Sequence, residues 1–169
     1  LIKGKHKTAF EFGLVLLIFL VVNIASQAAQ RPITYNNGQS FDGVFYYRVA
    51  NQIAHDMEIR ADAPFVYRIG TPFLAASFFK ADLIFGFKMV NIIANLAAVL
   101  LFTFWLRLFL RDWPIRVLLV ALFITQWHSP IRFTYYDPTY TDPWLFVFLL
   151  AGLIVIQRLK TNPGFAVTL

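Results

Sequence analysis

Acidic and tyrosine side chains that could do chemistry gather in two polar segments, each flanked by long apolar runs. Asp42 lies in the first segment, just before Tyr46 and Tyr47, and Asp137 lies in the second, after another tyrosine pair. A charged group close to hydrocarbon is costly unless it has solvent, a partner or a task. Either aspartate can act as a general base that accepts a proton from a hydroxyl group. Capping is the alternative for Asp42, because it precedes a predicted helix.

Three arginines in the same segments, Arg48, Arg68 and Arg132, have the chemistry to hold a phosphate group. Guanidinium groups bind phosphate oxygens bidentately. Arg68 is the strongest of the three, because the residues around it, from Phe65 to Ile69, are otherwise apolar or aromatic. Contact with lipid head groups or pairing with nearby aspartates explains each arginine equally well.

Asp142 is a further candidate for ligand binding. It precedes Pro143 at the start of an apolar run, which is also typical of an N-cap followed by proline at the first helical position. The oxygen atoms of Asp42 with those of Asp137 or Asp142 suit a divalent cation, and we keep this alternative open. The chain has no cysteine and its histidines lack ligand-spaced neighbours, so we predict no zinc site.

Composition indicates a membrane protein. Hydrophobic residues make up 59% of the 169 residues and charged residues only 14%, against roughly a quarter charged in soluble domains. The net charge of +6 does not indicate nucleic-acid binding, because most basic residues stand at the ends of apolar segments. We therefore predict an all-α, polytopic membrane protein whose residues 1–169 form a single transmembrane domain.

We predict about four transmembrane helices, at residues 12–29, 90–109, 115–127 and 144–156. The first run is uncharged and long enough to span a hydrocarbon core of roughly 30 Å. A signal peptide is the alternative, since three lysines precede it, although the run exceeds the usual ~7–15 apolar residues. The third and fourth runs are short and would need interfacial residues such as Trp113, Trp127 and Trp144, or a thinned bilayer.

Basic residues predict the orientation of these helices. If all four segments cross the membrane, three basic clusters fall on one side, and the positive-inside rule makes that side cytoplasmic. The clusters are Lys3, Lys5 and Lys7, then Arg107, Arg111 and Arg116, then Arg158 and Lys160.

Within the outer loop over residues 30–89, the sequence pattern predicts helices that lie in the membrane interface. From Gly43 to Glu58 an apolar residue recurs every fourth position, which indicates an amphipathic helix lying in the interface plane. The stripe consists of Phe45, Val49, Ile53 and Met57. A second short helix is predicted to begin near Thr71-Pro72 and to run through Phe79.

With these segments in place, the chain resembles GT-C glycosyltransferases, polytopic membrane enzymes that use polyprenyl-phosphate-linked sugars. The resemblance covers nearly the whole chain and rests on Asp42 to Tyr47 with Ala50, Tyr67-Arg68, Pro72 to Ala75, Asn91 to Leu96, and Thr141-Asp142. Members usually have more spans than the four predicted in this chain. We therefore expect residues 1–169 to be the N-terminal part of a longer membrane domain.

The resemblance implies transfer of a sugar from a polyprenyl-phosphate donor to an acceptor glycan, lipid or protein on the extracytoplasmic side. It implies that Asp42 and Asp137 are catalytic and that six further residues bind substrate: Arg68, Arg48, Arg132, Tyr46, Tyr47 and Asp142. For the tyrosines, an aromatic belt at the membrane boundary is the alternative to stacking against a sugar. The expected location is the bacterial inner membrane, with the N-terminus cytoplasmic.

The alternative function is a non-catalytic membrane subunit whose outer loop docks a partner chain, since an interfacial amphipathic helix suits either role. A transporter is disfavoured, because transporters place polar groups near the midplane of their spans and these spans contain few.

Overall fold

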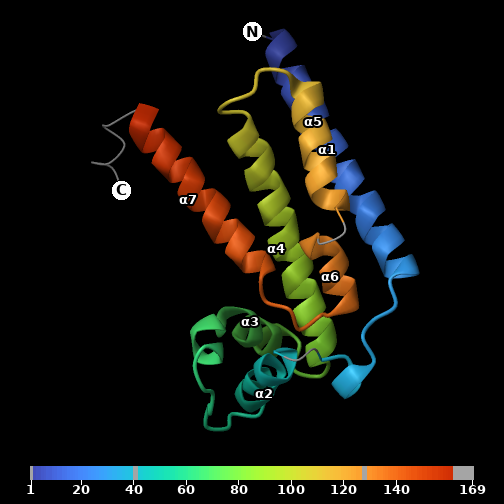
Figure 1. Cartoon of the computed structure of the whole chain (residues 1–169), viewed down its shortest axis with the longest axis vertical. Helices are drawn as coiled ribbons and strands as arrows, with labels where there is room; N and C mark the ends of the chain where they lie inside the picture. Colours follow the sequence, from blue (N-terminus) through green and yellow to red (C-terminus); the bar gives the residue numbers. More distant parts are fainter. Residues whose placement is uncertain (1, 40–41, 127–128, 162–169) are drawn as a thin grey trace.

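The structure, a computed structural model, describes residues 2–39, 42–126 and 129–161, and its regular elements there are all helices (Figure 1). The α-helices are α1 (Ile2–Ala29), α2 (Gly43–Ala54), α3 (Gly70–Phe78), α4 (Leu83–Leu106), α5 (Trp113–Thr125), α6 (Pro130–Tyr136) and α7 (Pro143–Thr161). There are two short 3-10 helices: η1 (Tyr35–Asn37) lies between α1 and α2, and η2 (Phe65–Arg68) lies between α2 and α3.

Three of these helices are long and apolar enough to cross a membrane, over Lys7–Ala29 in α1, Leu83–Leu106 in α4 and Pro143–Thr161 in α7. They correspond to the predicted spans 12–29, 90–109 and 144–156. α4 begins earlier than predicted because the Asp82 carboxylate caps it, accepting a hydrogen bond from the backbone N–H of Phe85 at 2.9 Å. The prediction of an all-α membrane protein is confirmed.

The predicted span 115–127 corresponds to α5, which has only 13 residues. At 1.5 Å per residue, such a helix covers about 20 Å, less than the roughly 30 Å of a hydrocarbon core. In Figure 1, α5 lies beside α1 and ends about halfway along it, and α6 lies beyond that end. α5 is therefore too short to span by itself, where a single spanning helix was expected. Trp127, expected to help complete this span, lies outside the described residues.

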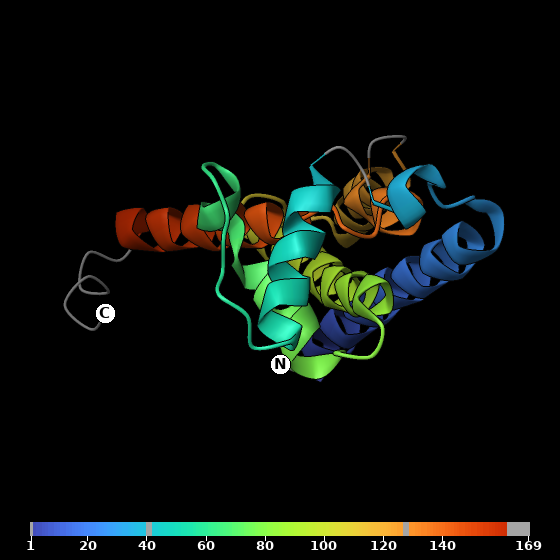
Figure 2. The same cartoon turned by 90° about the horizontal axis from the view of Figure 1, so that it is seen from below.

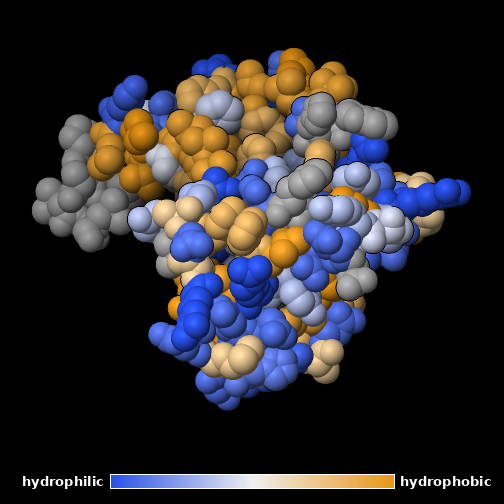
Figure 3. All heavy atoms as spheres, turned by 60° about the horizontal axis from the view of Figure 1, so that its bottom comes forward, coloured by the Kyte–Doolittle hydropathy of each residue, from blue (hydrophilic) through white to orange (hydrophobic). Residues whose placement is uncertain are grey.

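The described basic residues of the three clusters stand at one end of the molecule. The N-terminal end of α1, the α4–α5 connection and the C-terminal end of α7 all lie at the top of Figure 1, and α2 and α3 lie at the bottom. Hydrophilic side chains gather over the α2–α3 end, whereas hydrophobic ones cover the helices behind it (Figure 3). This separation is what a membrane boundary requires.

The main core lies between α1, α4, α5 and α6. Its fully buried side chains include Val15, Val99, Val120, Ile124 and Ile131. α7 is different, because only 6% of its apolar window is buried. Seen from below, it extends away from α1 and α6 (Figure 2).

The outer helices α2 and α3 pack against the first turns of α4. Small side chains, Ala50, Ala75 and Ala76, allow the close approach, and all three are fully buried. Gly86 of α4 is part of the same contact, because a Cβ built there would lie 2.8 Å from the Cβ of Phe79. These contacts fix α2 and α3 to the membrane-spanning helices.

The predicted stripe on the first outer helix is partly wrong. α2 begins at Gly43 as expected but ends at Ala54, so Met57 lies beyond it and is 48% exposed. Phe45 is 39% exposed, whereas Tyr46, Val49, Ala50 and Ala54 make the buried face. Tertiary packing explains the difference between the predicted and the observed buried face. Packing against α3 favours the face of α2 with small side chains over the most apolar face. The second helix, α3, was predicted close to its observed position.

Candidate functional site

The two outer loops meet at an ion pair between Arg68 and Asp142. Arg68 ends η2, and Asp142 directly precedes α7, 74 residues further along the chain. Arg68 Nη1 donates to Asp142 Oδ1 at 3.1 Å, and the two side chains are 52% and 31% exposed. The backbone carbonyl of Asp142 accepts from the N–H of Leu145 at 2.9 Å, so this residue also begins α7.

This ion pair lies on the wall of a pocket of about 450 Å³ between η2, α3 and the start of α7. The remaining wall is mostly apolar or aromatic, formed by Tyr67, Gly70, Thr71, Leu74, Thr141, Trp144, Leu145 and Phe148. Its volume lies within the range of about 300–1,000 Å³ that is usual for small-molecule sites. An apolar pocket with a few convergent polar groups is the form expected of a binding site.

Tyr140 connects the pocket to the buried part of the second loop. Burial, followed by its hydrogen bond with the Asp142 carboxylate, raises the pKa of Tyr140 well above its usual value near 10. The negative charges of Asp142 and Asp137 act in the same direction. Tyr140 therefore stays a neutral phenol at physiological pH, and its O–H remains a donor to Asp142.

Asp137 is only 5% exposed, and its Oδ1 accepts a hydrogen bond from Thr139 Oγ1 at 2.8 Å. Asn91 of α4 holds this loop in place, because its Nδ2 donates to the backbone oxygens of Pro138 at 2.9 Å and Tyr140 at 2.6 Å. Asp137 is thus close to Tyr140 but is not among the residues that line the pocket.

Asp42 is exposed and precedes α2. Its side chain makes no capping hydrogen bond; its backbone carbonyl instead accepts from the N–H of Phe45 at 3.0 Å. The capping explanation therefore does not account for the carboxylate. Asp42 does not line the pocket either.

The other predicted binding residues lie apart from Arg68. Arg48 stacks over the Phe45 ring, with 5.7 Å from its Cζ to the ring centroid. Arg132 donates from Nε to Gln30 Oε1 at 2.7 Å. The three arginines thus contact different partners in different places and do not form one phosphate site.

Tyr46 and Tyr47 belong to the packing between α2, α3 and α4. Tyr46 is 3% exposed and meets the ring of Phe65 edge-on at 5.5 Å, and Tyr47 packs against the same cluster. Tyr46 therefore supports η2, the element that carries Arg68.

Among the described residues, no group of three His, Cys, Asp or Glu side chains is placed to hold a metal ion.

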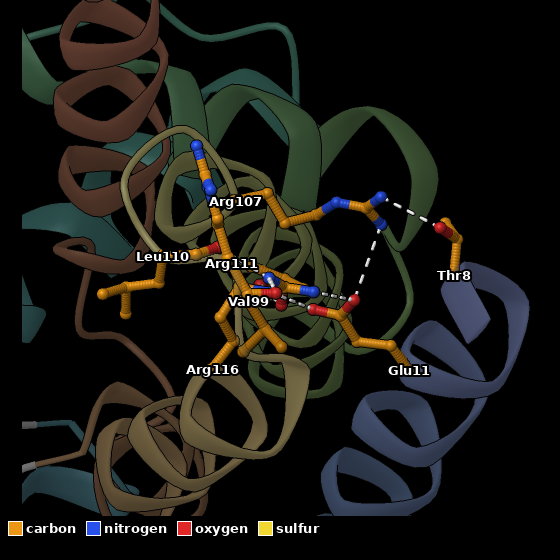
Figure 4. Close-up of polar contacts among 8 residues, drawn as sticks. Thr8, Glu11, Val99, Arg107, Leu110, Arg111 and Arg116 are labelled. Carbon is orange, nitrogen blue, oxygen red and sulfur yellow. Dashed lines mark hydrogen bonds and ion pairs between the residues drawn. The ribbon is translucent and has the colours of Figure 1, made fainter. Parts of the chain in front are cut away.

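Sequence reasoning missed a buried ion cluster at the opposite end of the molecule. Glu11 of α1 is 1% exposed, and its two carboxylate oxygens accept from Nε and Nη2 of Arg116, each at 2.6 Å (Figure 4). Arg107 Nη1 lies 3.7 Å from the same carboxylate. Arg116 Nη1 also donates to the backbone oxygens of Leu110 and Arg111, at 2.7 and 2.9 Å.

This cluster ties α1 to the α4–α5 connection. The signal in the sequence was a single glutamate next to a long apolar run, since such a charge requires a partner. The basic residues after α4 were interpreted only as markers of orientation, and one of them is that partner.

A second polar network joins α1, α4 and α6. Asn23 Oδ1 accepts from the hydroxyl of Tyr135 at 2.9 Å, and Lys88 Nζ hydrogen-bonds to Gln27. The Lys88 ammonium lies 4.7 Å from the centroid of the Tyr135 ring. These contacts satisfy polar groups that would be costly within the bilayer.

Comparisons with protein-family models, with curated proteins and with solved structures found no match to this chain.

Proposed function

We propose that the chain is the transmembrane part of a glycosyltransferase that takes a sugar from a polyprenyl-phosphate-linked donor. The observation that carries this proposal is the meeting of Arg68 and Asp142 at 3.1 Å on the wall of a largely apolar pocket. The two residues come from different loops, and each is a substrate-binding candidate in its own right. A cationic group beside apolar walls suits a lipid-linked phosphate.

In this proposal Asp42 is the general base. Asp42 is exposed at the start of α2 and makes no side-chain capping hydrogen bond, although it does not line the pocket that would hold the donor. It accepts the proton of the acceptor hydroxyl as that oxygen attacks the anomeric carbon and the lipid phosphate leaves. Asp137 is the weaker candidate, because it is buried and hydrogen-bonded to Thr139. The proposal puts the pocket on the extracytoplasmic side of the bacterial inner membrane; the basic residues at the opposite end of the molecule support this orientation.

The test is sugar transfer by the full-length protein in lipid nanodiscs, with a panel of polyprenyl-phosphate sugars. Asp42→Asn keeps the size of the side chain but removes the base, so turnover should fall about 10²–10⁴-fold with normal folding. Arg68→Ala should raise the donor KM. Arg60→Ala is the matched control, because Arg60 is an exposed arginine of the same loop whose guanidinium pairs with the exposed carboxylate of Glu58.

Undiminished turnover in Asp42→Asn would reject its role as the base. Absence of transfer from every donor would favour the alternative, a non-catalytic subunit.

A further inference from the structure

Two buried asparagines of α4 hold segments that follow α5. Asn91 and Asn95 stand one turn apart and are 0% and 1% exposed. In each, Nδ2 donates to atoms outside α4, whereas Oδ1 has no partner in the part of the chain that the structure describes. An unpaired buried acceptor costs stability, whereas the donors of each amide fix the place of another segment.

Asn91 holds the connection between α6 and α7, which crosses the lower part of α4 in Figure 1. Its Nδ2 donates to the backbone oxygens of Pro138 at 2.9 Å and of Tyr140 at 2.6 Å. A side-chain amide has two N–H donors in a fixed plane. Bonds from both to carbonyls of the same loop therefore fix the orientation of that loop as well as its place.

The polar wall of the pocket follows directly after this anchored backbone. Tyr140 is hydrogen-bonded to the Asp142 carboxylate, and Asp142 Oδ1 accepts from Arg68 Nη1 at 3.1 Å. Thr141, between the two, also lines the pocket. Asn91 itself does not line it, so an effect of Asn91 on the pocket must pass through the loop.

We propose that Asn91 is a positioning residue for the pocket: its amide holds the loop where Tyr140 and Asp142 meet Arg68. The anchor is a 24-residue helix long enough to cross the membrane. A misplacement of about 1 Å at a binding site, caused by a change far from the ligand, can cost up to about 10²-fold. The proposal rests on the proposed function only where sugar transfer is the readout.

Asn95 supplies a matched control on the same face of α4. Its Nδ2 donates to the backbone oxygen of Pro130 at 3.3 Å and to Thr134 Oγ1 at 2.9 Å. Both partners belong to α6, before the loop that leads to the pocket. Asn91→Leu and Asn95→Leu therefore remove the same number of buried hydrogen bonds, but only the first releases the loop.

The first experiment is independent of sugar transfer. Tyrosine carrying a carbon-13 label at Cζ is incorporated into the full-length protein in micelles, and Tyr140→Phe identifies the Tyr140 signal. In the unchanged protein this signal should not titrate up to about pH 11, because burial and the hydrogen bond with Asp142 raise the pKa of Tyr140. Asn91→Leu should return that pKa toward its usual value near 10, whereas Asn95→Leu should not.

The second experiment measures transfer kinetics with the same two variants. Asn91→Leu should raise the donor KM about tenfold, because a misplaced Asp142 changes the setting of Arg68. Its kcat should stay within about twofold, since the change removes binding and not the base. Asn95→Leu should keep both constants within about twofold.

A Tyr140 signal that stays silent in Asn91→Leu, or that changes equally in Asn95→Leu, would overturn the proposal. If Asn91→Leu does not fold, Asn91→Ser and Asn95→Ser make the same comparison. A serine hydroxyl bonds back to its own helix, as the Thr103 hydroxyl does to the Val99 oxygen at 2.8 Å, and cannot reach the loop.

The outcomes for the pocket and for the reaction are separable. The expected tyrosine signals without any transfer by the unchanged protein would reject the proposed function and keep the positioning role of Asn91. Transfer with an unchanged donor KM in Asn91→Leu, or with an equal rise in Asn95→Leu, would reject the positioning role alone.

Discussion

Replacement of Glu11 by leucine should destabilise the protein more than any exposed charge substitution. Glu11 is 1% exposed and accepts two hydrogen bonds of 2.6 Å from Arg116, which is itself 8% exposed in its side chain. Removing one partner of a buried ion pair leaves an uncompensated charge, which typically costs about 3–5 kcal/mol. Arg107 would lose the same counter-charge, 3.7 Å away. We therefore expect Glu11→Leu to lower the free energy of unfolding by about 3–5 kcal/mol.

The assay is reversible unfolding in mixed micelles of rising denaturing-detergent content, followed by tryptophan fluorescence. Glu58→Leu is the control, because Glu58 and Arg60 form an ion pair at 2.8 Å whose side chains are 75% and 80% exposed. Such a pair contributes about 0–1 kcal/mol, so the control should barely shift the transition.

A charge exchange sharpens this test. The double variant Glu11→Arg with Arg116→Glu restores opposite charges, but it should not restore stability. Arg116 Nη1 also donates to the backbone oxygens of Leu110 and Arg111, and a glutamate cannot donate to them. A loss in Glu11→Leu no greater than in Glu58→Leu, or full recovery in the exchange, would refute the reasoning.

Three further predictions concern the outer end and the topology. Gly86→Val should cost about 1–3 kcal/mol of stability, because its Cβ would lie 2.8 Å from that of Phe79 and would force α3 away from α4. Tyr140→Phe should make stability less sensitive to alkaline pH: the raised pKa of Tyr140 means that its contribution is complete below about pH 10 and is lost as pH rises beyond it. Cysteines at His55 and Arg111, both exposed, should react with an impermeant thiol reagent from opposite sides of the membrane.

The two stability predictions are checked by the midpoint of thermal or detergent unfolding, and the topology prediction is checked by thiol labelling. Gly152→Val is the control for the glycine, since a Cβ there has nothing within 4 Å, and equal effects at both positions would contradict the packing explanation. For the tyrosine, midpoints are compared at about pH 9 and about pH 11, and parallel losses in both proteins would contradict the shift. Labelling of both cysteines from one side would reject the topology.

Local patterns were enough to place most helices. The apolar runs predicted α1, α4 and α7, because helix formation in a bilayer depends on the length and hydropathy of the segment itself. The apolar periodicity placed the start of α2, and Thr71-Pro72 placed the start of α3 close to its observed position. Where a single side chain decides a boundary, as Asp82 does for α4, hydropathy alone gave the wrong residue.

The candidate site was accessible to sequence reasoning only in part. Arg68 and Asp142 were both chosen for their chemistry, yet their contact spans 74 residues of sequence and follows from the packing of α3 and α7 around α4. Oγ1 of Thr141 and Nε1 of Trp144 are buried with no hydrogen-bond partner in the part of the chain that the structure describes. No sequence signal marks them, because whether a polar atom is paired depends on neighbours from other elements.

By itself, the sequence determined that this is an all-helical membrane protein with polar segments between its spans, because hydropathy and charge act locally along the chain. Only the tertiary structure decided that α5 packs beside α1, that α2 turns its small side chains inward, and that Glu11 meets Arg116. Each of these outcomes depends on which partner a helix face or a charge finds. That choice is made by packing between residues far apart in sequence, as between Glu11 and Arg116, 105 positions away.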